Sequence, residues 1–343
     1  MTAKSKLMAP LYKRLANAGL QKAYVRAHGL PDWWEDGYAA EAGTFYEAKL
    51  TLSRRLGLEL GSVLDDDQPI RFRDIGNCRF KAERNKGGCQ QGPAQSLART
   101  LAEMAAVAVA TPYRPLPSTG LTLREDILSE RHPWVDFEGL LTYLWAHGIP
   151  VLFLSNPPPP AGMDGMVTMV RGRPVVVLAR KDKSCAWQLF ILAHEAGHIA
   201  LGHVRDNETL TDNKIDKQDK DPEEAGANHA AIEIITANGN TTFGSTTGRW
   251  FSAEQLAHEA MRYGAEHHID PGHIALNYGN ANGQMPAARA ALKIIEPDSV
   301  RAQDIIFRRL VENIDPDRLP EDSYDFLMRM CGSANQGKPE PRP

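Results

Sequence analysis

The chain has 343 residues, a formal net charge of −4 and 42% hydrophobic residues, which is close to an ordinary soluble globular protein. No apolar run approaches the roughly 18–20 residues that cross a bilayer, and the first residues, MTAKSKLMAPLYKRL, lack the apolar stretch of a signal peptide. These features argue against a membrane-spanning or secreted chain. They predict a cytoplasmic protein of two domains, or of one large domain with appendages.

The four cysteines are Cys78, Cys89, Cys185 and Cys331. In a cytoplasmic protein we expect these thiols to be reduced. A free thiol usually behaves as a small buried hydrophobic side chain, and this is the first expectation for each of the four. Cys78 and Cys89 stand in a basic stretch and have a second interpretation, given below.

Residues 1–67 are predicted to form a helical region. LYKRLANAGLQKAYVRAHGL has apolar residues at three- and four-residue spacing, and LPDWWEDG then breaks the pattern with a proline and a glycine. A helix and a short second helix follow. The last part, SRRLGLELGSVLDDD, resembles the tail of small repressor-type helix-turn-helix domains. A plain helical subdomain is the alternative.

Residues 68–121 begin with a basic stretch, PIRFRDIGNCRFKAERNKGGCQ, in which two phenylalanines are interleaved. Cations that hold phosphates and rings that stack on bases are what single-stranded nucleic acid binding uses. A solvated basic connecting strand is the alternative. The helix AQSLARTLAEMAAVAVA follows. The candidate nucleic-acid-binding cations are Arg71, Arg73, Arg79, Lys81, Arg84 and Lys86.

Residues 122–250 predict a core that mixes helices with short strands. Three β-branched runs, bounded by Gly, Pro and Asp, predict strands at 150–155, 165–170 and 173–180. RGR between the last two runs predicts a hairpin. The helix CAWQLFILAHEAGHIALGH comes next.

A polar, charged segment without periodicity follows this helix and is expected to be a loop. The pattern EEAGANHAAIEII then predicts a second helix. Residues 251–333 are predicted to be mainly helical, and the tail 334–343 is predicted to be disordered.

The helix after the strands contains the pattern H-E-x-x-H. His194 and His198 are four residues apart and therefore project from the same face of the helix. Two such imidazoles can share one Zn²⁺ ion, while Glu195, about a quarter of the circumference away, can act as a general base on water. AHEAM at 257–261 begins alike but has Arg262 in place of the second histidine, so we expect a solvated helix there.

A catalytic zinc ion takes three protein ligands and keeps one position open. The helix EEAGANHAA offers Glu224 as the third ligand, with Asn228 four residues on to hold a ligand imidazole. Glu223 is the rival, one step off that face. His203 falls about half a turn out of phase with His194 if the helix continues through it, so we expect no metal contact from it. A closed zinc site or a core histidine pair is the structural alternative.

Short strands followed by LAHEAGHIALGH and EEAGANHAA resemble the ImmA/IrrE family of zinc metallopeptidases. The resemblance covers roughly residues 122–237. It implies a gluzincin-like α+β fold, with ligands His194, His198 and Glu224 and base Glu195. It also implies a single regulatory cut in a helix-turn-helix repressor. The sequence departs from the family at His229 and after Ile235, where a usual LLMP is absent.

LPDWWEDG, SRRLGLELGSVLDDD and CRFK with its following helix are similar to the CapP-type proteases of bacterial anti-phage (CBASS) operons. That likeness implies a peptidase held inactive by a cysteine on the zinc and activated by single-stranded DNA. A thiolate is a strong zinc ligand, and the cations around Cys78 would favour the thiolate form. Cys89 is the alternative inhibitory cysteine.

The sequence therefore predicts a cytoplasmic α+β zinc endopeptidase that cuts a transcriptional repressor and responds to DNA. Two other functions remain open. A DNA-binding regulator with a non-catalytic metal site would be indifferent to loss of Glu195, and a protease of broad specificity would digest casein.

Overall fold

The structure is a computed structural model. It describes residues 7–73, 78–80, 92–159, 163–180, 182, 184–205, 208–212, 221–244, 250–297 and 300–332, with the backbone alone at 78–80 and 212. Helices and one mixed β-sheet make up these ranges, so the predicted α+β class is confirmed. In the described ranges, no helix combines the length and the apolar character that crossing a membrane requires.

The α-helices before the hairpin are α1 (Met8–Asn17), α2 (Lys22–Tyr24), α3 (Ala42–Leu56), α4 (Leu60–Leu64), α5 (Pro93–Ala108), α6 (Gly120–Ser129) and α7 (Phe137–Ala146). Those after it are α8 (Cys185–Ala200), α9 (Pro222–Thr236), α10 (Ala253–His267), α11 (Pro271–Ala281), α12 (Met285–Ile295), α13 (Ala302–Asn313) and α14 (Glu321–Cys331). Short helical turns are η2 (Val25–Gly29), η3 (Asp36–Ala40) and η4 (Pro316–Arg318).

One sheet of five strands lies at the centre, in the order β1-β5-β3-β4-β2. The central strands β3 and β4 form the predicted antiparallel hairpin, and β5 also runs antiparallel to β3. The outer strands pair in parallel, β1 with β5 and β2 with β4. The strands are β1 (Cys78–Phe80), β2 (Val151–Phe153), β3 (Gly165–Val170), β4 (Arg173–Leu178) and β5 (Thr209–Asp212).

The turn of the hairpin consists of Arg171 and Gly172, whose φ angles are 52° and 74°. Positive φ at both central residues is the backbone of a type I′ turn, which matches the twist of the two strands. The three predicted strands and their hairpin are thus confirmed.

β5 corrects the expectation of a loop after α8. Its residues lie in a charged segment, but Thr209, Leu210 and Thr211 are buried. Pairing with β3 stabilises this short strand. Because strand formation depends on such neighbours as much as on composition, the polar sequence around β5 concealed it.

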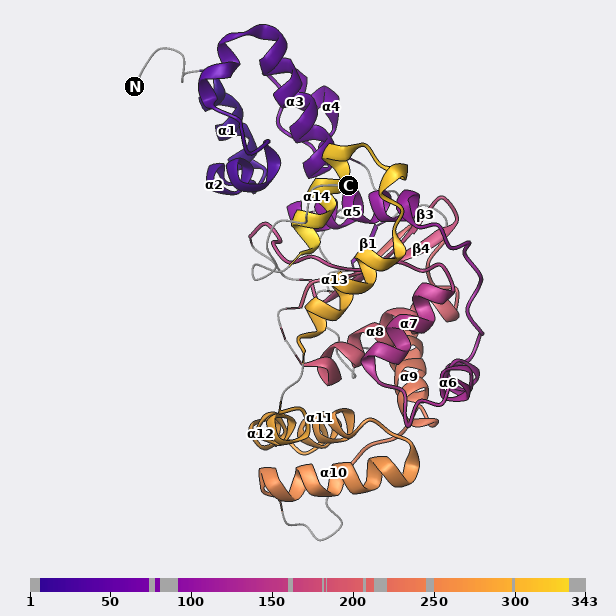
Figure 1. Ribbon diagram of the computed structural model, residues 1–343. Helices are drawn as coiled ribbons and strands as arrows, with labels where there is room; N and C mark the ends of the chain where they lie inside the picture. The colour runs from indigo at the N-terminus through magenta and orange to yellow at the C-terminus, as the bar shows by residue number, and fades with distance from the viewer. Residues whose placement is uncertain are drawn as a thin grey trace.

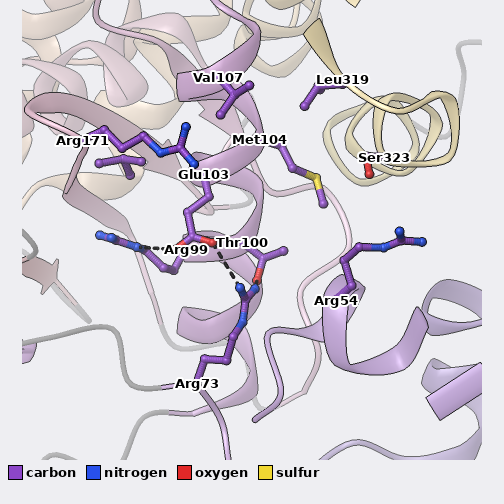
Figure 2. Close-up of a pocket in the computed structure, with 11 residues that line it drawn as sticks. Arg54, Arg73, Arg99, Thr100, Glu103, Met104, Val107, Arg171, Leu319 and Ser323 are labelled. Atoms are coloured by element: carbon purple, nitrogen blue, oxygen red, sulfur yellow. Dashed lines mark hydrogen bonds and ion pairs between the residues drawn. The ribbon is translucent and has the colours of Figure 1, made fainter. Parts of the chain in front are cut away.

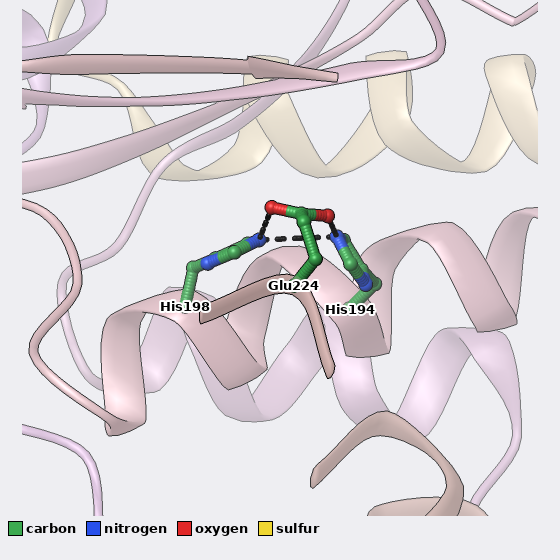
Figure 3. A group of neighbouring side chains, drawn as sticks. All are labelled: His194, His198 and Glu224. Atoms are coloured by element: carbon green, nitrogen blue, oxygen red, sulfur yellow. Dashed lines mark hydrogen bonds and ion pairs between the residues drawn. The ribbon is translucent and has the colours of Figure 1, made fainter. Parts of the chain in front are cut away.

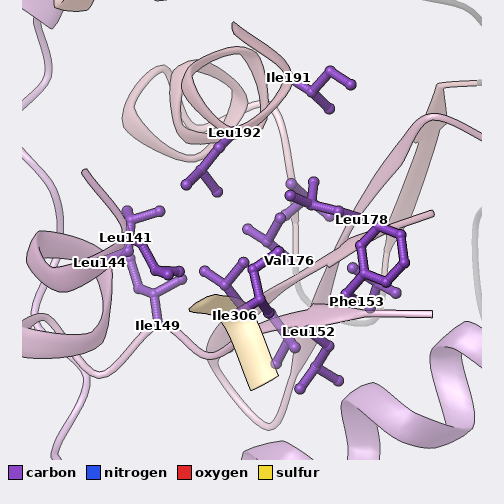
Figure 4. Close-up of a cluster of buried hydrophobic side chains, with 14 of the residues drawn as sticks. Leu141, Leu144, Ile149, Leu152, Phe153, Val176, Leu178, Ile191, Leu192 and Ile306 are labelled. Atoms are coloured by element: carbon purple, nitrogen blue, oxygen red, sulfur yellow. The ribbon is translucent and has the colours of Figure 1, made fainter. Parts of the chain in front are cut away.

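The principal hydrophobic core lies between the sheet and the helices packed on it. Figure 4 shows Ile191 and Leu192 of α8 together with Val176 and Leu178 of β4 in this core. Strands β2 and β4 are apolar almost throughout because both of their faces are covered. The same core also takes side chains from α5, α13 and α14, which lie outside residues 122–250.

Two smaller helical groups lie at opposite ends of the molecule (Figure 1). At one end α1–α4 enclose a cluster of their own that includes Leu11, Leu52 and Leu56. At the other end α10, α11 and α12 pack around Tyr278 and small alanines. The segment 251–333 is mainly helical as predicted, and its last two helices return to the principal core.

Arg124 of α6 is buried and connects three distant parts of the chain. Its guanidinium donates to the carbonyl oxygen of Ile235 at 2.6 Å and to that of His268 at 2.5 Å. The last carbonyl groups of a helix lack partners within the helix, so Arg124 supplies one for α9. The position of α9 therefore depends on residues well before and well after it.

Candidate metal centre

Helix α8 carries the two histidines into the core. The Ser184 side chain caps its N-terminus, and apolar residues on the remaining faces bury the helix against the sheet and α7. His194 and His198 are both fully buried, with ring planes at 84° to each other. Their Nε2 atoms lie 3.0 Å apart, so the two imidazoles converge as the four-residue spacing predicted.

Helix α9 brings a carboxylate to this pair. The Asp221 side chain caps α9 and Pro222 occupies its first turn, which is where proline is best tolerated. α9 approaches α8 closely because position 197 is glycine. A Cβ atom there would lie 3.0 Å from the Ala227 carbonyl oxygen and 3.2 Å from the Ala230 Cβ.

The Glu224 carboxylate meets both imidazoles (Figure 3). One oxygen lies 3.3 Å from Nε2 of His194, and the other lies 3.3 Å from Nε2 of His198. Among the described residues, this is the group of histidine, cysteine and acidic side chains whose ligand atoms all lie within 4.8 Å of one another. Glu224 is only 3% exposed, so the group is closed off from bulk water.

The spacing of these atoms fits a tetrahedral ion. With ligand bonds of about 2.0–2.2 Å, the ligand atoms of a tetrahedral zinc site lie about 3.3–3.6 Å apart. The separations of 3.3, 3.3 and 3.0 Å are close to that range. Two imidazoles and one carboxylate can therefore hold a metal ion here and leave a fourth position for another ligand.

The outer nitrogen of each imidazole has its own partner. Asn228 Oδ1 lies 3.2 Å from Nδ1 of His194, and His203 Nδ1 lies 2.9 Å from Nδ1 of His198. Because an amide oxygen only accepts, Nδ1 of His194 donates, which leaves Nε2 of the neutral ring as an acceptor directed at the centre. A proton on Nδ1 of His198, donated to Nδ1 of His203, likewise leaves Nε2 of His198 as an acceptor directed at the centre. Such partners fix the orientation of metal-ligating histidines.

The contact of His203 with His198 differs from the sequence expectation, which assumed that the helix continues. α8 ends at Ala200, and Gly202 has a φ of 68°. The His203 amide then donates to the His198 carbonyl, and the Gly202 amide donates to that of Ile199. These two bonds define a Schellman motif, which turns the chain back over the last turn of the helix. His203 is thereby directed at the back of His198 and not at the centre.

Glu195 is fully buried next to β3. A Cβ atom at Gly165, the first residue of β3, would overlap a Glu195 carboxylate oxygen and lie 2.9 Å from its Cδ. Only glycine therefore leaves room for the carboxylate in this position. The role of Gly165 was not predicted from the sequence, because the contact joins residues 30 positions apart and no local pattern marks it.

The ionisation of Glu224 depends on its neighbours. Burial raises the pKa of this carboxyl, but the hydrogen bonds and positive charge of His194 and His198 lower it by more, so its pKa falls well below the usual range. Positive charge in the centre thus keeps this carboxylate ionised. Protons or a divalent cation can supply that charge.

The other histidines and carboxylates considered from the sequence do not belong to the group of His194, His198 and Glu224. Glu223 is half-buried and its amide bonds to the Asp221 side chain, while Glu224 is the carboxylate that joins the histidines. His229 is exposed on α9 and lies against Gly239. In α10, His258 is exposed and Glu259 is half-buried, and Glu259 pairs with Arg262 at 2.8 Å, as expected of a solvated helix.

The predicted nucleic-acid residues fall partly within the described chain. Arg71 pairs with Glu59 at 3.2 Å, and Arg73 lies 3.4 Å from Glu103. Phe72 is partly buried against the N-terminal core, so its ring is not an open stacking platform. The side chain of Arg79 and all of Lys81, Arg84 and Lys86 lie outside the described residues.

The two candidate inhibitory cysteines cannot be compared at the centre. The backbone of Cys78 pairs with Thr209 in the outer strand β1, whereas its side chain and all of Cys89 lie outside the described residues. Cys185 and Cys331 are free thiols. Burial raises the pKa of each of these two thiols to about 12, which is the behaviour expected of structural cysteines.

Comparison of the chain with family models, with curated proteins and with solved structures found no match in any of the three. The chemistry of the centre therefore follows from its residues and their geometry. Two imidazoles and a carboxylate that can hold a metal ion lie beside a second buried carboxylate, that of Glu195 on α8.

Proposed function

We propose that this chain is a zinc-dependent endopeptidase with a gluzincin-like core. The observation that carries the proposal is the convergence of His194, His198 and Glu224 beside the buried carboxylate of Glu195. A purely structural metal site would not require Glu195. Glu195 directly follows His194 on α8, so its carboxylate can act on a water molecule at the ion without being a ligand itself.

The side chains of the centre have different proposed roles. His194, His198 and Glu224 hold the ion, which when bound lowers the pKa of a water molecule and polarises a carbonyl group. Glu195 takes a proton from the attacking water on a carboxylate oxygen and later delivers it to the leaving amine. Asn228 and His203 keep the two imidazoles oriented from behind.

Burial of the centre supports a regulated peptidase. Because His194, Glu195 and His198 are fully buried, a peptide reaches Glu195 only after covering atoms move. A protease that digested proteins broadly would benefit from an open cleft. Burial therefore favours a restricted substrate. The resemblance of the sequence to ImmA/IrrE peptidases and CapP-type proteases implies that this substrate is a helix-turn-helix repressor, and that the activating signal is single-stranded DNA acting through Cys78 or Cys89.

The experiment offers the chain a purified helix-turn-helix repressor as substrate, with and without single-stranded DNA. With single-stranded DNA present, wild-type protein should cut the repressor at a single bond. Glu195→Gln should reduce the rate on the order of 10²–10⁴-fold, the usual contribution of a general base. Glu259→Gln is the matched control, because it makes the same change in the exposed His-Glu pair of α10 and should leave the rate unchanged.

The outcomes separate the parts of the proposal. Cleavage that persists in Glu195→Gln would contradict the catalytic role. Cleavage by wild-type protein without DNA, at the same rate in Cys78→Ser and Cys89→Ser, would retain the peptidase and remove the cysteine switch. Digestion of casein would show a broad protease. Metal binding with no cleavage of the repressor would favour a DNA-binding regulator with a non-catalytic metal.

A further inference from the structure

A second site lies away from the metal centre, where the N-terminal helices meet the principal core. Here a cavity of about 480 Å³ opens between α3, α5, the β3–β4 hairpin and α14. Its volume is within the range of about 300–1,000 Å³ that small-molecule sites occupy. Four arginines from four segments of the chain line it: Arg54, Arg73, Arg99 and Arg171 (Figure 2).

Among the described residues of the lining, positive charge exceeds negative charge. Glu103 is the carboxylate of this described lining, and Arg73 and Arg99 share it at 3.4 and 3.1 Å (Figure 2). Arg54 is paired with Asp322 of α14, which lies outside the lining. The side chains of Arg54 and Arg73 remain 51% and 42% exposed, so a ligand from water can reach these two side chains.

Arg171 is the most informative of the four. It occupies the first central position of the type I′ turn, where asparagine or glycine is preferred because φ is positive. Arginine is therefore found at this position although the backbone conformation is unfavourable for it. Within the described parts of the chain, Arg171 has no ion-pair partner, although its side chain lines the cavity.

The remaining wall of the cavity is apolar. Met104 and Val107 of α5, Val170 of β3 and Leu319 form it, and the hydroxyl groups of Thr100 and Ser323 lie between the apolar and the cationic parts. A ligand that fits both parts has an anionic end and a flat or apolar end. A simple inorganic anion would use only the arginines.

We propose that this cavity binds a phosphorylated small molecule of nucleotide size. Planar guanidiniums bind phosphate oxygens through paired hydrogen bonds, and several guanidiniums suit more than one phosphate group. The base of the nucleotide packs on the apolar wall. This binding does not rest on the proposed peptidase function.

Arg171 is the residue to substitute, because the other three arginines also form bonds that join separate parts of the fold. Arg99 is buried and donates to the Met169 carbonyl of β3 at 2.9 Å, while Arg73 donates to Thr100 Oγ1 at 2.9 Å. Arg131 provides a matched control. It is an exposed arginine with a similar positive φ of 68°, and it does not line the cavity.

The test is calorimetric titration of the full chain, at constant ionic strength and without magnesium, with ATP, AMP, adenosine and pyrophosphate. We expect ATP to bind at one site, AMP more weakly and adenosine not at all. Arg171→Gln should weaken ATP by about tenfold, the value of one charge-assisted contact, and Arg131→Gln should not change it. His194→Ala should bind ATP as wild type does, so failure of the metal centre would leave this result intact.

Four results would overturn the proposal. The first is no binding of any phosphate compound. The second is equal ATP affinity in wild type and Arg171→Gln. The third is equal affinity for pyrophosphate and ATP, which would show that the apolar wall contributes nothing and that an inorganic anion suffices. The fourth is a single-stranded oligonucleotide that binds more tightly than ATP and depends on Arg171, which would indicate a nucleic-acid groove.

Discussion

Helices α8 and α10 contain the same five residues, Leu-Ala-His-Glu-Ala, at 192–196 and 256–260. In α8 all five are buried. In α10 the leucine and alanines are buried, but the His258 and Glu259 side chains are 75% and 42% exposed. The same pentapeptide is thus fully buried in one helix and partly exposed to water in the other.

The residues that follow make the difference. α8 continues with Gly197 and His198, whereas α10 continues with Met261 and Arg262. Glycine lets α9 pack closely, and the second imidazole completes the pair. Met261 and Arg262 keep the corresponding face of α10 in water, where Arg262 forms ion pairs with Glu259 and Glu266. α10 is therefore an internal control for the residues that α8 contributes to the centre.

The largest expected effect is loss of metal. Purified wild-type protein should contain about one zinc ion per chain, because a third protein ligand completes a catalytic site. His194→Ala and His198→Ala should each contain almost none, while His258→Ala should match wild type. Metal content is measured by plasma mass spectrometry. Equal zinc in all four proteins would mean that the ion binds elsewhere.

Gly165→Ala should separate catalysis from metal binding. The added methyl group displaces the Glu195 carboxylate, and a misplacement of about 1 Å can lower a rate on the order of 10²-fold. Repressor cleavage should fall by that factor with zinc content unchanged. Gly43→Ala is the control, since nothing lies within 4 Å of its added Cβ. An unchanged cleavage rate in Gly165→Ala would contradict the proposed role of Glu195 as the general base.

Removal of the outer partners should have an intermediate effect. His203 and His267 each follow the first histidine of their pentapeptide by nine residues, but only His203 contacts a ligand. His203→Ala and Asn228→Ala should weaken zinc binding about 10–100-fold, the usual result of losing such a partner. His267→Ala, whose ring packs on Tyr263, should not. Competition with a chelating dye measures the affinities.

The smallest effect concerns packing alone. Gly197→Ala should destabilise the fold by about 1–3 kcal/mol through overpacking against α9, even though alanine favours helix by about 1 kcal/mol. Met261→Ala alters the equivalent position of α10, which is 40% exposed, and should stay within about 0.5 kcal/mol of wild type. Urea unfolding measures both. A stabilised Gly197→Ala would show that the α8–α9 approach is not tight.

The sequence predicted the parts of the centre that lie on one helix, together with the hairpin beside it. His194, His198 and Glu195 follow from helical spacing, and Glu224 and Asn228 follow from the same spacing on a second helix. These predictions need only local geometry. The meeting of the two helices is confirmed by the contact of Glu224 with both imidazoles.

What the sequence did not predict depends on chain reversal or on distant contacts. His203 required the end of α8 at a left-handed glycine, and Gly202 was the available signal. β5 required its pairing with β3, and Gly165 required the packing of α8 on the sheet. The four arginines of the cavity come from segments that no local pattern connects.

Arg124 sets a lower limit on the piece of chain that can be studied alone. The guanidinium that supports the end of α9 also bonds to the carbonyl of His268, 144 residues further along. A fragment confined to residues 122–250 would keep every metal ligand but would leave a buried guanidinium with one of its two anchors missing. Such a fragment is expected to hold α9 loosely. Truncation experiments on the centre should therefore retain the chain through α10 and its C-cap.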